Sequence, residues 1–310
     1  MDALDLLQKT SRTFAVAIPM LPEPTRHSVT LAYLLMRVVD TFEDAATWPK
    51  ARKVAALATI GEVLRRPARQ WARGGSQVAR LADRSPPSTH AGYLELLATA
   101  RELFERCAQL PDRPRAAVAR AAITMAEGMG RFIERSDAQG RLQLRSRAEL
   151  HEYCYVAAGL VGELLTELFL HDVPSLGPAA PTLQATMISF GEGLQLVNIV
   201  KDADDDANEG RVFLPPTMSR AHAIELARAD LRQAARYVLA LEAHHAPPGA
   251  LAFTGLSLVL ATRTLDALAR GQKKLSRAEV AAATAELSQA LEAEVSLAQL
   301  LEAPEAFVRT

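Results

Sequence analysis

Two acidic segments carry the residues that are best suited to chemistry. Asp40 and Asp44 follow one apolar run, and Asp202 and Asp206 follow another. Residues four apart in a helix lie on one face, so each pair presents two carboxylates in the same direction. Packed carboxylates without a partner are costly, and we therefore expect a cation beside them. Oxygen ligands on rigid helices suit Mg²⁺, which usually links carboxylates to substrate phosphates.

Polar and basic side chains accompany each acidic pair. Arg37 lies within one helical turn of the first pair, and Lys201 adjoins the second. Gln195 and Asn198 fall on or near the same stripe as the second pair. Two such faces opposite one another would hold a diphosphate and its metal ions. The alternative is that both pairs are solvated helix ends.

A short polar run near the N-terminus offers another phosphate contact. Ser11, Arg12 and Thr13 place two hydroxyl groups and a guanidinium next to Phe14. These groups are able to clamp a phosphate. A helix N-cap followed by a surface arginine is the alternative reading of the same residues.

Composition limits the classes of protein to consider. The chain has 310 residues, of which 49% are hydrophobic and 5% aromatic, and its formal net charge is -1. This length and apolar content allow a large core, and the abundance of Ala and Leu favours helices. The absence of a basic surplus argues against nucleic acid as a main partner. The cysteines, Cys107 and Cys154, have no disulfide or metal pattern, which favours a reduced, cytoplasmic setting.

The apolar segments predict a soluble protein. Residues 1–5 lack the basic start and apolar run of a signal peptide. The longest apolar stretch, residues 251–261, falls short of the roughly 20 residues of a membrane span. A lipid product would still bring the protein into peripheral contact with a membrane.

Helix breakers divide the chain into long helical blocks that must position these residues. We find no alternating β pattern and no internal repeat, so we predict a single all-α domain over residues 1–310. Loops are expected at residues 84–88, 110–114 and 171–181. One helix of about 20 residues is predicted to follow Pro24 and end near Asp44, a second to start at Pro49 and run past Arg66, and a third to follow the loop at 171–181 and carry residues 195–206. The other predicted helices are 116–133, 148–170, 218–243, 250–270 and 277–301.

The helix over residues 156–170 is apolar nearly all round, which is typical of the centre of a large bundle. Ala157, Ala158, Gly159 and Gly162 leave room beside it. An apolar tunnel for a substrate chain would use that room, and so would close packing against another helix.

Four segments together resemble the squalene/phytoene synthases in order and spacing, over residues 8–270. They are Ser11-Arg12-Thr13-Phe14, then Tyr33 and Arg37 with Asp40-Thr41-Phe42-Glu43-Asp44, then Tyr153-Cys154-Tyr155-Val156-Ala157-Ala158-Gly159-Leu160-Val161-Gly162, and finally residues 195–206 with Gly210-Arg211. The resemblance implies an all-α isoprenoid synthase fold, a helical bundle around a central cavity. It also implies a magnesium-dependent, head-to-head condensation of two prenyl diphosphates.

The resemblance also implies roles for individual residues. Each aspartate pair would hold Mg²⁺ on one of the two diphosphates, with Asp40 and Asp202 essential for turnover. The residues that would orient these groups are Gln195, Asn198 and Lys201. The residues that match positions for holding diphosphate and lining the pocket are Ser11, Arg12, Phe14, Tyr33, Arg37 and Arg211.

Tyr153 matches the tyrosine proposed to manage the proton lost when a cyclopropyl intermediate forms. The departing pyrophosphate is itself basic enough to take that proton, and a buried tyrosine with a satisfied hydroxyl is a further alternative. Ionising an allylic diphosphate leaves a carbocation, so the leaving group must be neutralised and water excluded. The carboxylates then serve as metal anchors rather than as acids or bases.

Within the family, the acidic motif at residues 40–44 resembles that of squalene synthases, which use NADPH to open the cyclopropyl intermediate. Lys50, Arg52 and Lys53 match the position of a basic flexible loop near the reductant, although a basic run is ordinarily just solvated. Ser257-Leu258 stands where many squalene synthases carry Pro-Gln, which weakens the case for reduction. The membrane-anchoring tail of eukaryotic squalene synthases has no counterpart, as in a soluble bacterial-type enzyme.

These features favour a squalene synthase acting on farnesyl diphosphate. A phytoene or dehydrosqualene synthase, which releases a diene without reductant, is the nearest alternative. A prenyltransferase acting on another acceptor is a further one. A scaffold protein of the same family is the non-enzyme alternative, but such proteins tend to lose the aspartates, and both pairs are intact here.

Overall fold

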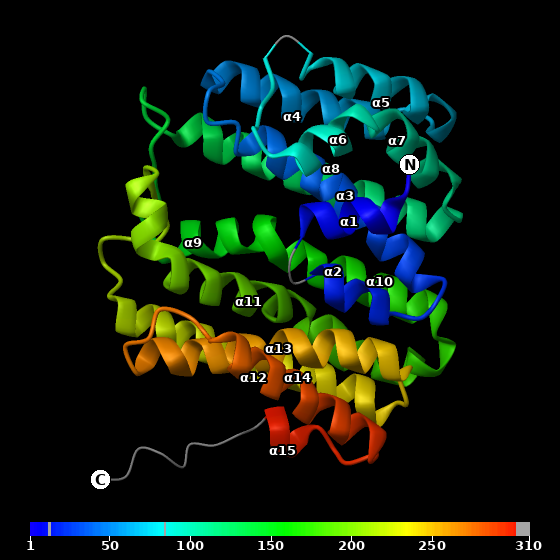
Figure 1. Cartoon of the computed structure of the whole chain (residues 1–310), viewed down its shortest axis with the longest axis vertical. Helices are drawn as coiled ribbons and strands as arrows, with labels where there is room; N and C mark the ends of the chain where they lie inside the picture. Colours follow the sequence, from blue (N-terminus) through cyan, green and yellow to red (C-terminus); the bar gives the residue numbers. More distant parts are fainter. Residues whose placement is uncertain (12–13, 84, 302–310) are drawn as a thin grey trace.

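Helices stacked in layers make up nearly all of the computed structural model, which describes residues 1–11, 14–83 and 85–301 (Figure 1). The α-helices are α1 (Ala3–Thr10), α2 (Phe14–Ala17), α3 (Thr25–Glu43), α4 (Lys50–Arg65), α5 (Trp71–Arg80), α6 (Ala91–Ala98), α7 (Ala100–Gln109), α8 (Asp112–Arg135), α9 (Arg147–Cys154), α10 (Leu160–Asp172), α11 (Ala180–Asn208), α12 (Arg220–Ala243), α13 (Pro248–Ala269), α14 (Arg277–Glu292) and α15 (Ala298–Leu301). Short 3-10 segments are Ile18–Met20, Ala68–Gln70 and Pro174–Ala179, and Tyr155–Gly159 is a π-helical turn. The all-α prediction is confirmed.

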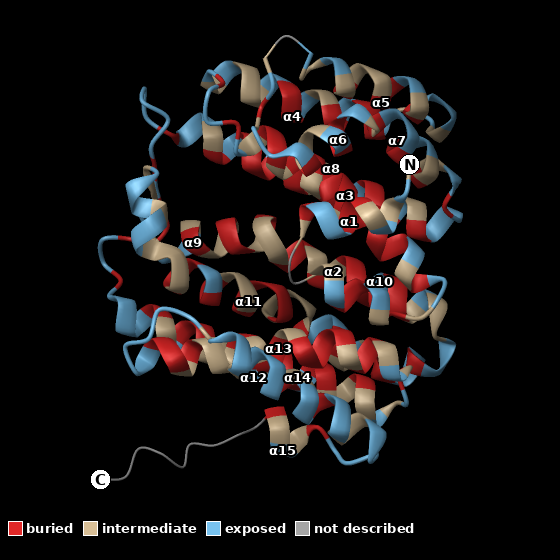
Figure 2. Cartoon of the chain, viewed as in Figure 1, coloured by how far each residue is buried: buried red, intermediate tan, exposed pale blue. Residues whose placement is uncertain are grey.

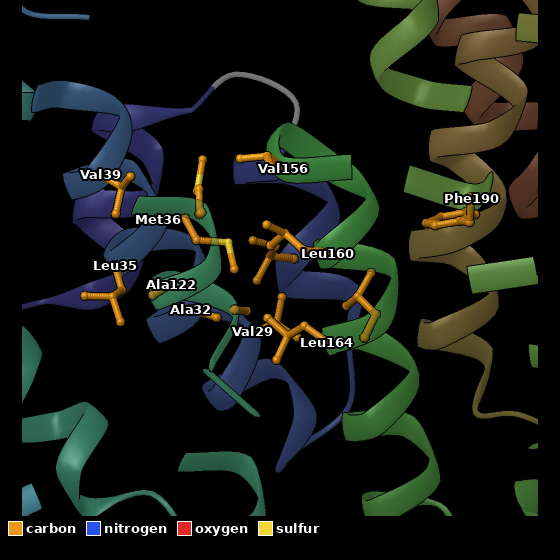
Figure 3. Packing of buried hydrophobic residues seen from close by; sticks show 14 of the residues in the cluster. Val29, Ala32, Leu35, Met36, Val39, Ala122, Val156, Leu160, Leu164 and Phe190 are labelled. Carbon is orange, nitrogen blue, oxygen red and sulfur yellow. The ribbon is translucent and has the colours of Figure 1, made fainter. Parts of the chain in front are cut away.

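Buried residues concentrate in the inner helices, while the outer helices expose one side to solvent (Figure 2). Figure 3 shows Ala32 and Met36 of α3 packed near Leu160 and Leu164 of α10, with Ala122 of α8 beside them. All of these side chains are buried. The core therefore holds α3, the carrier of the first acidic pair, firmly between two other helices.

The second acidic pair lies at the end of α11, where buried residues give way to exposed ones. Leu196, Val197, Ile199 and Val200 are at most 3% exposed, whereas the carboxyl-terminal residues 204–209 are mostly exposed. Apolar residues on the inner face fix the rotation of the helix about its axis, because that face must be buried. The polar stripe therefore faces outward from the core.

The small residues of the central helix serve close packing between helices. A Cβ atom added at Gly162 would lie 1.8 Å from the Met187 carbonyl oxygen of α11, and one at Gly191 would lie 2.1 Å from the Ala158 oxygen. Such contacts are impossible for real side chains, so the two backbones approach where only glycine fits. The sequence allowed either a substrate tunnel or close helix packing beside these small residues. At Gly162 and Ala158, the space is used for close packing against α11.

Some predicted boundaries are wrong. The helix predicted to start at residue 116 begins at Asp112, because Pro114 lies in the first turn, where its missing N–H costs nothing. The last predicted helix stops at Glu292, and a short α15 follows. The structure also contains one element that the sequence does not predict, a parallel pair of two-residue strands, β1 (Leu142–Gln143) and β2 (Arg211–Val212).

Two helical segments correct the expectation about membrane spans. Arg147–Asp172 and Pro248–Ala269 are long and apolar enough to cross a membrane, judged by length and composition alone. The apolar window of each is more than half buried within the fold, at 61% and 56%. Burial in the core is sufficient reason for their apolar composition.

Candidate active site

The two acidic segments meet at the guanidinium of Arg211. Its Nη1 lies 3.1 Å from Asp44 Oδ1 at the end of α3, and its Nη2 lies 3.2 Å from Asp206 Oδ1 near the end of α11. Nη2 also lies 2.6 Å from Glu209 Oε2. One cation therefore joins the ends of two helices that are far apart in the sequence.

Local backbone geometry places Arg211 at this position. Gly210 has a φ of +82°, which favours glycine, and it ends the turn after α11. The Leu142 N–H donates to the Gly210 oxygen at 2.9 Å, and the Leu144 N–H donates to Val212 at 3.0 Å. Side chains alternate along a strand, so Arg211 and Phe213 leave it on the same side. The short parallel pair thus aims both side chains at the site.

Arg37 forms the corresponding cationic group on α3. Its Nη1 lies 3.2 Å from Asp40 Oδ2, and its Nη2 donates to the Tyr33 hydroxyl at 3.0 Å. The Tyr33 hydroxyl in turn donates to the Thr10 carbonyl oxygen at 3.1 Å. These residues recur every three or four positions along α3, so they line one face and tie it to the end of α1.

The N-terminal polar run is only partly described. Arg12 and Thr13 lie outside the described residues. The Ser11 hydroxyl accepts a hydrogen bond from the Phe14 N–H at 3.0 Å, as expected for a cap at the start of α2. The centroid of the Phe14 ring lies 5.7 Å from that of Tyr33 and 6.4 Å from that of Phe253, so these aromatic rings form one apolar wall.

Negative charge predominates at the two helix ends. Desolvation raises the pKa of Asp40 to about 6, with Arg37 opposing and Asp44 adding to the rise. Desolvation likewise raises the pKa of Asp206, against the effect of Arg211. The pKa of Glu43 is also raised, by burial and then by the neighbouring carboxylates. Additional positive charge would therefore stabilise the ionised form of this cluster.

The residues present fit Mg²⁺ together with an anionic oxygen ligand. Within the described part of the chain, no three His, Cys, Asp or Glu side chains gather closely enough to hold a metal alone. Carboxylates in pairs suit Mg²⁺, which keeps several waters and takes substrate phosphate oxygens. The Nε atoms of Arg37 and Arg211 are buried and have no hydrogen-bond partner among the described residues. Diphosphate oxygens would supply acceptors for such donors.

The polar stripe of α11 lies as the sequence predicts. Lys201 Nζ donates to Asn198 Oδ1 at 3.0 Å and lies 3.2 Å from Asp202 Oδ2. Gln195 is half-buried one turn earlier, and the Asp202 side chain is 45% exposed. The roles of these residues in orienting a diphosphate stay a prediction.

Tyr153 is buried between two aromatic rings next to the acidic cluster. Its ring centroid lies 5.2 Å from Phe132, edge to face, and 4.4 Å from Phe213. Burial raises the pKa of the Tyr153 hydroxyl well above its usual value, with Glu43 as the next largest cause. The hydroxyl therefore stays protonated within electrostatic reach of the carboxylates at the end of α3.

The basic residues expected to bind NADPH lie in the first turn of α4 rather than in an open loop. Lys50 Nζ donates to the carbonyl oxygens of Glu134 and Ser136 at 2.6 and 2.7 Å. Lys53 Nζ donates to the Glu43 oxygen at 2.8 Å, and the Arg52 guanidinium lies 3.7 Å from the Trp48 ring centroid. The two lysines thus donate to carbonyl oxygens at the carboxyl-terminal ends of α8 and α3. A role of these residues in binding NADPH stays a prediction.

Three residues of the site were not predicted. Glu43 was seen in the acidic motif but was given no role, and its pKa shift marks it as part of the cluster. Phe213 and Phe132 enclose Tyr153. The sequence does contain a signal for Phe213, because it lies two residues after Arg211 and alternate residues of a strand share a side.

Squalene synthases are among the proteins of known function that resemble this chain in sequence. Botryococcus squalene synthase of Botryococcus braunii is 30% identical over 228 residues, which are 72% of this chain and 44% of that protein. The chain spans less than half the length of this relative and of other squalene synthases that it matches.

Two solved structures share the fold. A complex of TcSQS with the ligand BPH1237 has a TM-score of 0.65 at 23% identity and covers 97% of this chain and 94% of that one. A dehydrosqualene synthase in complex with a ligand has a TM-score of 0.53 at 17% identity, covering 94% and 95%. The family model for squalene/phytoene synthase matches residues 7–224, which include both acidic segments and Tyr153. This chain belongs to the squalene/phytoene synthase family.

Proposed function

We propose that the protein is a squalene synthase, which condenses two farnesyl diphosphates head to head and then reduces the cyclopropyl intermediate to squalene. The observation that carries this proposal is the meeting of Asp44 and Asp206 at one guanidinium. Two acidic helix ends that share a cation are suited to binding a diphosphate between them. The squalene synthase relatives support the choice of substrate.

In this proposal, each group of residues has a separate task. Asp40, Asp44, Asp202 and Asp206 would hold Mg²⁺, which would supply positive charge against the departing pyrophosphate. Arg37 and Arg211 donate hydrogen bonds to diphosphate oxygens. The aromatic wall of Phe14, Tyr33 and Phe253 excludes water from the carbocation.

An assay with farnesyl diphosphate and Mg²⁺, with and without NADPH, tests the overall reaction. NADPH supplies the hydride that opens the cyclopropyl ring. We expect squalene only when NADPH is present, and the cyclopropyl diphosphate without it. A diene formed under both conditions would identify a dehydrosqualene synthase. No product of thirty carbons under either condition would contradict the proposal and favour another acceptor.

The dehydrosqualene reaction is the second candidate, because α13 lacks the expected polar group. The Ser257 hydroxyl donates to the Phe253 carbonyl oxygen at 3.0 Å, and Leu258 is 1% exposed. Neither residue presents a free polar group to a reductant. The structural similarity to a dehydrosqualene synthase is compatible with this alternative.

Tyr153→Phe is expected to slow the first half-reaction by about 100-fold, because general acid–base groups contribute about that much or more. The measurement is single-turnover formation of the cyclopropyl diphosphate without NADPH. Tyr155→Phe is the matched control, since the Tyr155 hydroxyl instead donates to Glu163 at 3.0 Å. An unchanged rate in Tyr153→Phe would assign that tyrosine to core packing.

A further inference from the structure

Arg211 and Mg²⁺ would bind the same two carboxylates. The guanidinium contacts one carboxylate from each acidic pair, Asp44 and Asp206, at 3.1 and 3.2 Å. A divalent ion bound to either carboxylate would repel the guanidinium at such short range. The arginine and the metal ion therefore compete for these two side chains.

The surroundings of Arg211 allow it to change partners. The Asp44 side chain is 54% exposed, so it lies free enough to release the guanidinium. The Glu209 side chain, which is 64% exposed, contacts the same Nη2. Glu209 would therefore still pair with the guanidinium after Asp44 and Asp206 had released it. The Arg211 Nε is buried and unpaired among the described residues, so one donor is available for another acceptor.

We propose that Arg211 exchanges its carboxylate partners for diphosphate when Mg²⁺ binds. It holds Asp44 and Asp206 near each other, yields them to the metal ion, and then donates its hydrogen bonds to diphosphate oxygens. This inference rests on the proposed function, since it assumes a magnesium diphosphate site. It adds that Arg211 opposes the binding of the metal and favours the binding of diphosphate.

Calorimetric titration of Arg211→Gln with two ligands tests this exchange, because the affinities for Mg²⁺ and for pyrophosphate should change in opposite directions. Mg²⁺ alone should bind about five- to tenfold more tightly than to the wild type, because a competing cation is gone. Inorganic pyrophosphate at saturating Mg²⁺ should bind about tenfold more weakly, because a guanidinium donor is lost. A merely structural role would weaken both.

Two further variants serve as controls. Arg220→Gln removes a guanidinium that lies 3.7 Å from Asp204, outside the carboxylate pairs, and should change neither affinity. Arg211→Lys keeps the charge but replaces the two-armed guanidinium by a single amine. It should shift both affinities in the same directions as Arg211→Gln, by smaller factors, and it covers the case in which Arg211→Gln does not fold.

The outcomes separate this inference from the proposed function. A wild type that binds neither Mg²⁺ nor magnesium pyrophosphate would contradict the proposed function itself. A wild type that binds both, with Arg211 variants that weaken both or change neither, would overturn only the exchange at Arg211. Opposite shifts support it.

Discussion

Replacing Asp40 or Asp202 by Asn is expected to reduce turnover by about 1,000-fold or more, since each change removes a carboxylate that anchors the Mg²⁺ needed to neutralise the leaving group. Asn has nearly the same shape as Asp, so the helices should remain folded. The measurement is the steady-state rate of product formation from farnesyl diphosphate and Mg²⁺, with circular dichroism as a check on the fold.

Asp204→Asn is the matched control for these variants. Asp204 lies on α11 near both site aspartates of that helix, but its side chain is 89% exposed and faces Arg220. The steady-state rate of product formation by Asp204→Asn should stay within about twofold of that of the wild type, as is usual for surface changes away from a site. Rates near that of the wild type in Asp40→Asn or Asp202→Asn would refute their metal roles.

Gly162→Ala is expected to lower the free energy of unfolding by about 3 kcal/mol, as overpacking of a tight core does. The added Cβ atom would meet the Met187 carbonyl oxygen at 1.8 Å, so α10 and α11 must move apart. Urea unfolding followed by circular dichroism measures the change.

Gly130→Ala is the control for the glycine prediction. Gly130 lies inside α8, and a Cβ atom there would meet nothing within 4 Å. This variant should be more stable than the wild type by about 0.5 to 1 kcal/mol, because Ala favours a helix over Gly. Equal effects of the two substitutions would contradict the packing argument.

The features set by nearby residues were predictable from the sequence. Proline and the apolar period located α3 and α4 closely, because both signals act within a few residues. The spacing of Asp40 and Asp44 and that of Asp202 and Asp206 put each pair on one face for the same reason. The resemblance to the squalene/phytoene synthases is confirmed by the family model over residues 7–224.

The contacts between distant segments were not predictable in this way. Nothing in the sequence near Arg211 indicates that its guanidinium reaches Asp44, because that contact depends on how α3 and α11 pack. The parallel pair of β1 and β2 is too short to leave a periodic pattern. The helix predicted over residues 148–170 contains the π turn at Tyr155–Gly159, which periodicity does not detect.

The exposure of the acidic residues also depends on tertiary structure. Two aspartates of one motif differ in surroundings, since the Asp40 side chain is 25% exposed and that of Asp44 is 54% exposed. Asp40 pairs with Arg37 of its own helix, whereas Asp44 pairs with Arg211 from the α11–α12 connection. The sequence alone treats them as equivalent, but the structure makes only Asp44 a bridge between the segments.

The most direct test of the account is a crystal structure with Mn²⁺ in place of Mg²⁺ and an unreactive thiodiphosphate analogue of farnesyl diphosphate. We predict anomalous density for metal ions bound to Asp40 or Asp44 and to Asp202 or Asp206, with diphosphate oxygens completing their coordination. Metal ions and diphosphate bound away from both aspartate pairs would contradict the central claim.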